Sequence, residues 1–138
     1  STELVYFLCT LLSKYVSLPD NFISKVIERE NIASTHLGNG IAVPHPSTVL
    51  LDDSKIVIAH LAKPIQWFDK KEVQWVFLLG MKKGDDPDQE ALIRALYTCI
   101  SDINFMRELS QRPSFSAFQT HLTSVLQIEE TSADSIFQ

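Results

Sequence analysis

The sequence is poor in the features that mark a membrane span, a zinc site or a nucleic-acid surface. No apolar run approaches the roughly 18 residues that suggest a transmembrane helix. Its two cysteines, Cys9 and Cys99, lack zinc-binding spacing and lie in apolar, helix-like contexts, so we expect buried free thiols. The 12 basic residues are scattered and outnumbered by 17 acidic ones, which argues against direct contact with nucleic acid.

The remaining composition is that of an ordinary globular protein. The 138 residues fit one domain, and a hydrophobic share of 45% is enough for a core. No secretory leader is recognisable at the start, so we expect a cytoplasmic setting, no membrane insertion and no cofactor. We expect a single domain over residues 1–127, excised from a longer protein, and a flexible C-terminal tail over residues 128–138.

Hydrophobic spacing predicts an alternation of helices and strands. Helices are predicted over residues 4–15, 19–27, 92–103, 105–109 and 115–126. Strands are predicted over Ile41–Val43, Ser54–Ala62 (with Pro64 ending it) and Val73–Met81. Asn31–Gly40 and Lys82–Asp88 are predicted to be loops. Strands among helices indicate an α/β layered sandwich.

The most informative stretch runs from Gly38 through Asn39 and Gly40 to Pro44 and His45. The glycines suit a turn in which positive φ costs little. The short apolar run that follows ends at Pro44, which fixes its own φ and stiffens the carrier of His45. An imidazole, whose ordinary pKa is near neutral, is thus presented at a strand end, as a nucleophile or proton carrier would be.

This stretch belongs to a longer array. It comprises Arg29-Glu30, Thr35 and Leu37-Gly38-Asn39-Gly40-Ile41-Ala42-Val43-Pro44-His45. The array resembles the active-site signature of fructose/mannitol-type enzyme IIA domains of the bacterial sugar phosphotransferase system. The resemblance extends from about Leu4 to Leu126.

The resemblance implies a fold, a reaction and partners. The fold would be a mixed central sheet with helices on both faces. His45 would be phosphorylated by the histidine phosphocarrier protein, and Arg29 would lie near the phosphoryl group. A guanidinium suits that role because it binds two oxygens at once. The chain would then act as a phosphotransferase intermediate, with an enzyme IIB or regulatory domains of the same longer chain as further partners.

The residues around His45 also have purely structural interpretations. Arg29 is either a phosphate ligand or a basic residue at a helix end. Glu30 either orients Arg29 or is an ordinary helix-end carboxylate, and Thr35 either bonds the loop or is a turn residue. Gly38 and Gly40 suit the backbone whatever the function, and their turn is a candidate to aim N–H groups at the phosphate.

Three other histidines compete with His45. We interpret His36 as a loop side chain, His60 as a satisfied sheet residue and His121 as a residue of the last helix surface. A metal site formed by His36, His45 and His60 lacks any ligand spacing, so no metal is expected.

Two departures from the signature bear on function. Sugar-transporting members usually carry a second histidine after the strand that corresponds to Val73–Met81, and residues 84–92 contain none. The small residue that often follows the active histidine is Pro46 here. Both departures resemble enzyme IIA-like domains attached to transcriptional regulators. We therefore favour a regulatory sensor domain, with a transport subunit that relays phosphate to an enzyme IIB as the alternative and a domain that only binds partners as a third.

Overall fold

The computed structural model describes residues 1–84 and 87–137, with side chains described through residue 126. The chain divides into two compact units, Ser1–Lys83 and Gly84–Gln138. Each unit is described by itself below. The single domain predicted over residues 1–127 stays a prediction.

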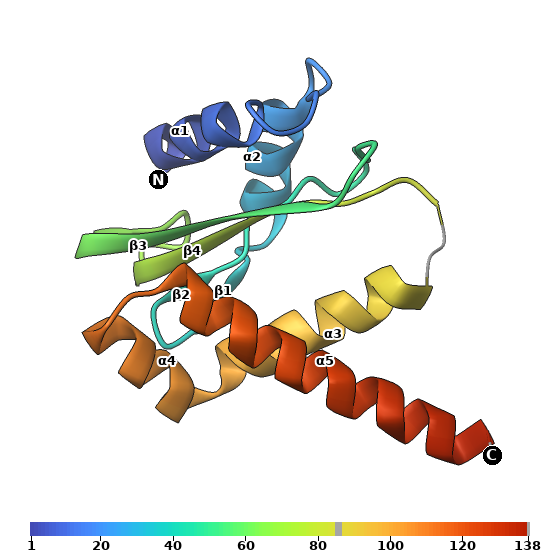
Figure 1. Ribbon diagram of the computed structural model, residues 1–138. Coiled ribbons are helices and arrows are strands. Elements are labelled where there is room, and N and C mark those ends of the chain that lie inside the picture. Colours follow the sequence, from blue (N-terminus) through green and yellow to red (C-terminus); the bar gives the residue numbers. More distant parts are fainter. Residues whose placement is uncertain (85–86, 138) are drawn as a thin grey trace. The chain divides into compact units, whose positions relative to one another are not determined.

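The first unit begins with two helices (Figure 1). Helix α1 spans Thr2–Leu12 and buries Val5, Leu8, Cys9 and Leu12 along one stripe. Helix α2 spans Phe22–Ile32, so it begins later than the predicted Pro19 and continues beyond the predicted end. Because α2 includes Arg29 and Glu30 in its last turn, both candidate residues are held by helical backbone.

Four strands follow and form one mixed sheet in the order β1-β2-β4-β3. They are β1 (His36–Gly38), β2 (Ile41–Ala42), β3 (Lys55–Gln66) and β4 (Glu72–Gly80). The pairs β1–β2 and β3–β4 are antiparallel, whereas β2 and β4 are parallel. The predicted α/β class with a mixed sheet is confirmed, but the continuous loop predicted over Asn31–Gly40 is wrong, because α2 and β1 occupy half of it.

Strand β3 continues through Pro64, contrary to the prediction that this residue ends it. Proline lacks the N–H that a ladder needs, so it is tolerated only at a sheet edge or a bulge. Both conditions hold, since β3 pairs only with β4 and its register shifts between His60 and Ile65. The proline therefore lies within a strand whose pairing is interrupted locally.

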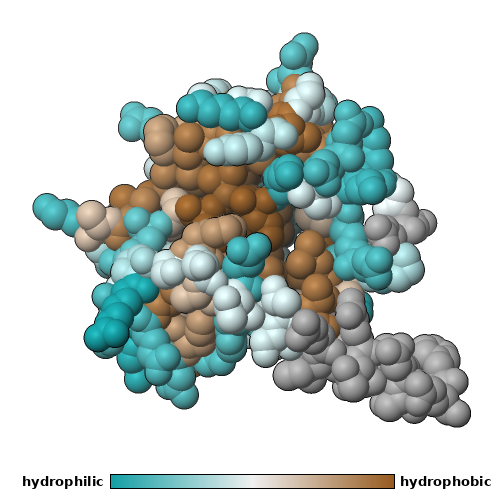
Figure 2. Space-filling view, in the orientation of Figure 1, coloured by the Kyte–Doolittle hydropathy of each residue, from teal (hydrophilic) through white to brown (hydrophobic). Residues whose placement is uncertain are grey.

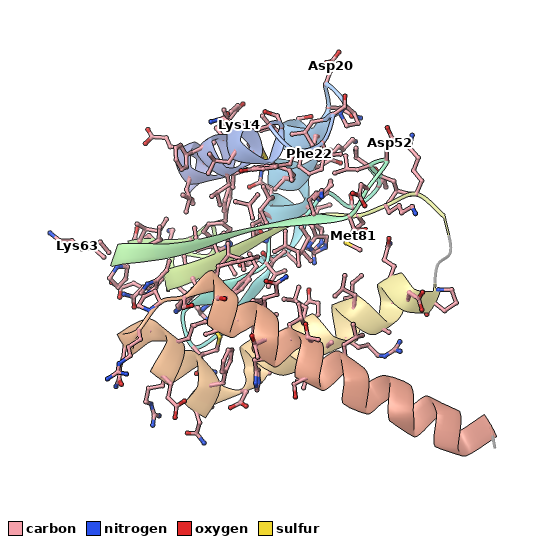
Figure 3. The ribbon with its side chains drawn as sticks, in the orientation of Figure 1. Lys14, Asp20, Phe22, Asp52, Lys63 and Met81 are labelled. Atoms are coloured by element: carbon pink, nitrogen blue, oxygen red, sulfur yellow. The ribbon has the colours of Figure 1, made fainter. Side chains whose placement is uncertain are left out.

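The core of the first unit lies between its helices and one face of its sheet. Helix α1 contacts β3 and β4, and Figure 2 shows hydrophobic residues along this junction in the upper half of the view. Phe22, labelled in Figure 3, is fully buried where α2 begins.

Cys9 of the first unit and Cys99 of the second are buried free thiols, as predicted, and burial raises the pKa of Cys9 to about 11.

The second unit contains three helices, α3 (Pro87–Ser101), α4 (Ile103–Gln111) and α5 (Phe115–Phe137). Asp102 caps α4 by accepting a hydrogen bond from the backbone N–H of Phe105 at 3.1 Å. Helix α3 contacts both α4 and α5. It begins within the loop predicted over Lys82–Asp88, of which residues 85 and 86 lie outside the described part of the chain.

Helix α5 is longer than the sequence predicts. It continues to Phe137, through the segment in which we expect a flexible tail, and residue 138 lies outside the described part. Whether that tail is flexible stays a prediction.

The parallel pair β2–β4 fixes where the functional residues lie. Parallel strands end at the same edge of a sheet, so the residues after β2 and after β4 are neighbours. The backbone N–H of Leu79 donates to the carbonyl of Pro44 at 3.0 Å, which extends this pairing beyond β2. Figure 3 shows Met81 and Lys63 at opposite ends of the β3–β4 pair, with Met81 at the edge where β2 and β4 end.

Candidate functional site

The turn before β2 is a two-residue β-hairpin turn. Gly38 pairs with Ile41, so Asn39 and Gly40 are its central residues. Their φ angles are 54° and 75°, and positive values at both positions are what a type I′ turn requires. The carbonyl of Gly40 accepts hydrogen bonds from Gln74 and Trp75 at 2.8 and 3.0 Å, which ties the turn to β4. The turn therefore fixes how the chain enters β2.

His45 follows β2 at the edge shared with β4. Its side chain is half-buried, and the prolines on either side of it are buried. Its Nδ1 lies 2.8 Å from the carbonyl oxygen of Val43. The imidazole is thus held by the backbone of the strand end that carries it.

This contact determines the tautomer of a neutral His45. A carbonyl oxygen only accepts hydrogen bonds, so Nδ1 must carry the proton that is shared with Val43. The lone pair then lies on Nε2, the other ring nitrogen. A neutral imidazole with its donor nitrogen fixed and its lone pair on the other nitrogen is arranged to act as a nucleophile.

Glu30 is an acidic residue that is linked to this strand end through Thr35. Its side chain is buried, with 3% of the residue exposed. The carboxylate accepts hydrogen bonds from the backbone N–H of Thr35 at 3.0 Å, the Thr35 hydroxyl, and the indole N–H of Trp67 at 2.9 Å. The described bonds of Glu30 therefore join α2 to the residue before β1 and to the β3–β4 turn, instead of orienting Arg29.

Thr35 connects Glu30 to the strand that carries His45. The backbone N–H of Val43 is within hydrogen-bond distance of both the Thr35 hydroxyl oxygen, at 3.2 Å, and the Thr35 carbonyl, at 3.3 Å. Because the hydroxyl donates to Glu30, its lone pairs are available to the N–H of Val43. Thr35 is thus a buried connector rather than an exposed turn residue.

Arg29 has a described role at the end of its helix. Its Nη1 donates to the carbonyl of Ala33, which follows α2. This bond satisfies one of the carbonyls that a helix end leaves without a partner. A guanidinium has five N–H donors, so a single such bond leaves donors for a phosphate.

A second polar contact joins β1 to the β3–β4 turn. Nδ1 of His36 lies 3.3 Å from a carboxylate oxygen of Asp69. His36 is the first residue of β1, so it is not the loop side chain that we expected. Desolvation acts to raise the pKa of Asp69. Hydrogen bonds from Lys71, Ser34 and His36, together with the charge of His36, outweigh it and lower that pKa.

The other histidines lie outside this network. His60 stacks on Trp75 with ring centroids 4.1 Å apart, and its Nε2 is buried with no described partner, so it is not the fully satisfied residue that we expected. His121 stacks on Phe105 at 3.9 Å and faces Asp102 at 3.8 Å. Among the described residues, no group of three or more potential metal-binding side chains lies together.

Sequence reasoning missed two members of the network. Trp67 is one, because 37 positions separate it from Glu30 and no spacing rule connects them. The carbonyl of Val43 is the other, because any residue supplies such a group. Within the part of the chain that the structure describes, no helix is long and apolar enough to cross a membrane.

Comparison with known families identifies the chain. Residues 1–125 match the family described as "Phosphoenolpyruvate-dependent sugar phosphotransferase system, EIIA 2". The chain belongs to this family. It is therefore an enzyme IIA domain of the type that the signature around His45 indicated.

Curated relatives of two kinds resemble the chain. The "Transcriptional regulator ManR" of Bacillus subtilis is 28% identical over 120 residues, which are 87% of this chain and 18% of that protein. The "Probable licABCH operon regulator" of the same organism is 27% identical over 113 residues, or 82% of this chain and 18% of that protein. The "PTS system fructose-like EIIA component" of Escherichia coli is 27% identical over 73% of this chain and 70% of that protein.

The chain spans only about a fifth of the two regulators.

Solved structures agree with the fold. The E. coli complex of enzyme IIA-Mtl with phosphorylated enzyme IIB-Mtl matches with a TM-score of 0.70 and 18% identity, over 90% of this chain and 88% of that one. The nitrogen regulatory protein IIA-Ntr of Neisseria meningitidis also matches with a TM-score of 0.70, at 22% identity, over 91% of this chain and 86% of that one.

We predict that Glu30→Gln destabilises the protein strongly. An amide presents an NH₂ group to at least one of the buried donors, which leaves that donor without an acceptor. We expect the free energy of unfolding to fall by about 2–4 kcal/mol, measured by urea denaturation.

Glu28→Gln on the same helix is the matched control. Glu28 is exposed and pairs with Lys25 at 3.0 Å, so its loss should cost about 0.5 kcal/mol or less. Equal effects of the two substitutions would contradict a structural role for the buried carboxylate.

Proposed function

We propose that this chain is a regulatory enzyme IIA domain that is phosphorylated on Nε2 of His45 by the histidine phosphocarrier protein. The observation that carries the proposal is the contact between Nδ1 of His45 and the Val43 carbonyl. It leaves the Nε2 lone pair as the nucleophile. The family to which the chain belongs supplies the reaction class, a phosphotransferase system that depends on phosphoenolpyruvate.

The transfer exchanges one phosphorus–nitrogen bond for another. The Nε2 lone pair of His45 attacks phosphorus while the bond to the phosphocarrier's own histidine breaks, and that histidine keeps the electron pair. The proton on Nδ1 stays on His45, where the Val43 carbonyl stabilises the growing positive charge of the ring. The protein mainly contributes positioning and electrostatic stabilisation, as is usual in phosphoryl transfer.

Arg29 is proposed to bind the phosphoryl oxygens as His45 accepts them. Arg29 is half-buried in the last turn of α2, and Thr35 and Glu30 link that turn to the strand carrying His45. Gly38, Asn39 and Gly40 are proposed as the supporting loop. Because the family model describes a phosphotransferase system, we propose that the domain acts in the cytoplasm, where a phosphocarrier and an enzyme IIB would meet it.

Two observations favour a regulatory role over relay. Two of the relatives are named as regulators, and the chain corresponds to only a fifth of each. Residues 84–92, after the strand β4, contain no second histidine. The alternative, a transport subunit that passes phosphate to an enzyme IIB, is favoured by the likeness to the fructose-like component.

We predict that His45→Ala abolishes phosphate uptake. The purified domain would be incubated with phosphoenolpyruvate, enzyme I and the phosphocarrier, and acid-labile phosphate would be located by mass spectrometry at alkaline pH. His121→Ala is the control and should retain normal uptake. Labelling of His45→Ala at the normal rate would exclude His45 as the acceptor.

We predict that Arg29→Lys lowers the rate of phosphorylation. Lysine keeps the charge but loses the fork that binds two oxygens at once. The loss of one charge-assisted hydrogen bond in the transition state corresponds to about a ten- to hundredfold slower rate. Arg107→Lys, at an exposed position of α4, should leave the rate unchanged. If Arg29→Lys also reacts normally, Arg29 serves the end of α2 alone.

We predict that phosphorylated His45 holds its phosphate as a signal. The measurement compares spontaneous loss from the purified phosphorylated domain with loss after candidate enzyme IIB proteins are added. Slow transfer, together with a change in transcription when His45→Ala is introduced into the longer protein, is the expected result. Fast transfer to a cysteine of an enzyme IIB would instead establish the transport subunit.

A further inference from the structure

Trp67 occupies the tight turn between β3 and β4. Its backbone N–H donates to the carbonyl of Lys71 at 2.8 Å, and its carbonyl accepts from Lys70 at 2.9 Å. The residue is 2% exposed, and its indole N–H donates to Glu30 at 2.9 Å. Because the residue is buried and its indole N–H is hydrogen-bonded, the direction of that N–H is restricted.

A continuous series of hydrogen bonds leads from this indole to the candidate phosphate acceptor. Trp67 and the Thr35 hydroxyl both donate to Glu30, the N–H of Val43 approaches the Thr35 hydroxyl oxygen, and His45 donates to the carbonyl of Val43. The Thr35 hydroxyl has a single hydrogen, and Glu30 accepts it. The lone pairs of that hydroxyl are therefore directed by where the carboxylate stands.

We propose, on the basis of the proposed function, that Trp67 is a positioning residue for phosphoryl acceptance by His45. By holding the Glu30 carboxylate, it keeps Thr35 and Val43 in place, and the Val43 carbonyl stays directed at Nδ1 of His45. The imidazole then keeps its proton on Nδ1 and its lone pair on Nε2. Trp67 has no described contact with His45 itself, so it acts through Glu30, Thr35 and Val43.

A second contact separates this role from a general one in folding. Asp69, two residues after Trp67, approaches His36 of β1 at 3.3 Å. The same turn is thus joined to β1 independently of the indole N–H. Removing that N–H alone should leave the turn attached to the sheet while it removes one of the two hydrogen bonds that Oε2 of Glu30 accepts.

The consequence should be visible at His45. In Trp67→Phe the ring still fills its buried position, but Glu30 keeps only its two bonds from Thr35. We expect the share of the neutral imidazole with its proton on Nε2 to rise. We expect phosphate uptake to fall about three- to tenfold, as for the loss of one hydrogen bond. The fall should be in kcat, with KM for the phosphocarrier unchanged.

The experiment uses the whole chain labelled with ¹⁵N in its histidines. Imidazole ¹⁵N chemical shifts at a pH where His45 is neutral report which nitrogen carries the proton. Two variants are compared with the unaltered chain, Trp67→Phe and a chain with benzothienylalanine at position 67. In benzothienylalanine, sulfur replaces the indole N–H and the two-ring shape is kept. Val5→Ala is the control, because it opens a cavity in the core cluster that also contains Trp67, while the Val5 side chain makes none of the hydrogen bonds in the series.

The expected result is a shifted His45 signal and slower uptake in both Trp67 variants, with neither change in Val5→Ala. Unchanged His45 signals in the Trp67 variants would overturn the proposal, as would an equal loss of uptake in Val5→Ala. If the unaltered chain accepts no phosphate at all, the proposed function fails. The ¹⁵N signals would still decide whether Trp67 positions the imidazole.

Discussion

One buried carboxylate connects three parts of the first unit. Glu30 is the last-turn residue of α2 at which Thr35, the residue before β1, and Trp67 of the β3–β4 turn direct hydrogen-bond donors. A buried charge is costly unless it is fully hydrogen-bonded, so these three elements stay together or the carboxylate loses its compensation. The position of β2, and with it the strand end that carries His45, depends on this arrangement through Thr35.

The pairing of the strands determines at which edge of the sheet His45 lies. The parallel pairing of β2 with β4 brings the residues after both strands to one edge. Pro44 extends the pairing by one more hydrogen bond, and the prolines on both sides of His45 restrict its backbone. An imidazole held in this way loses little conformational freedom when it reacts, which is how an enzyme lowers the entropic part of a barrier.

The sequence allows much of this to be predicted, but unevenly. The helical stripes around Leu8 and Leu96, the apolar run of β4 and the Asn39-Gly40 turn follow local periodicity and turn chemistry, and the structure contains them. Strand β1 was missed because it has three residues, one of them glycine, and its pairing with β2 is what defines it. The continuation of β3 through Pro64 was missed because the edge position that tolerates proline is a property of the sheet.

The same division applies to the candidate site. Residues of the contiguous array, His45 above all, were found because they form a recognisable pattern along the chain. Trp67, the distant partner of Glu30, was not found, because it meets Glu30 only after the β3–β4 pair has formed. A hydrogen bond across 37 positions leaves no local trace in composition or periodicity. Its members become visible together only in three dimensions.

The edge strand β3 has a further consequence, for solubility. An exposed strand edge offers unpaired N–H and carbonyl groups to strands of other molecules, and such pairing leads to aggregation. In β3 the interruption between His60 and Ile65 contains Lys63 and Pro64, a charge and a residue without a backbone donor. Figure 3 shows Lys63 extending away from the sheet at this end. The irregularity that makes the strand hard to recognise also protects the sheet against growth by further strands.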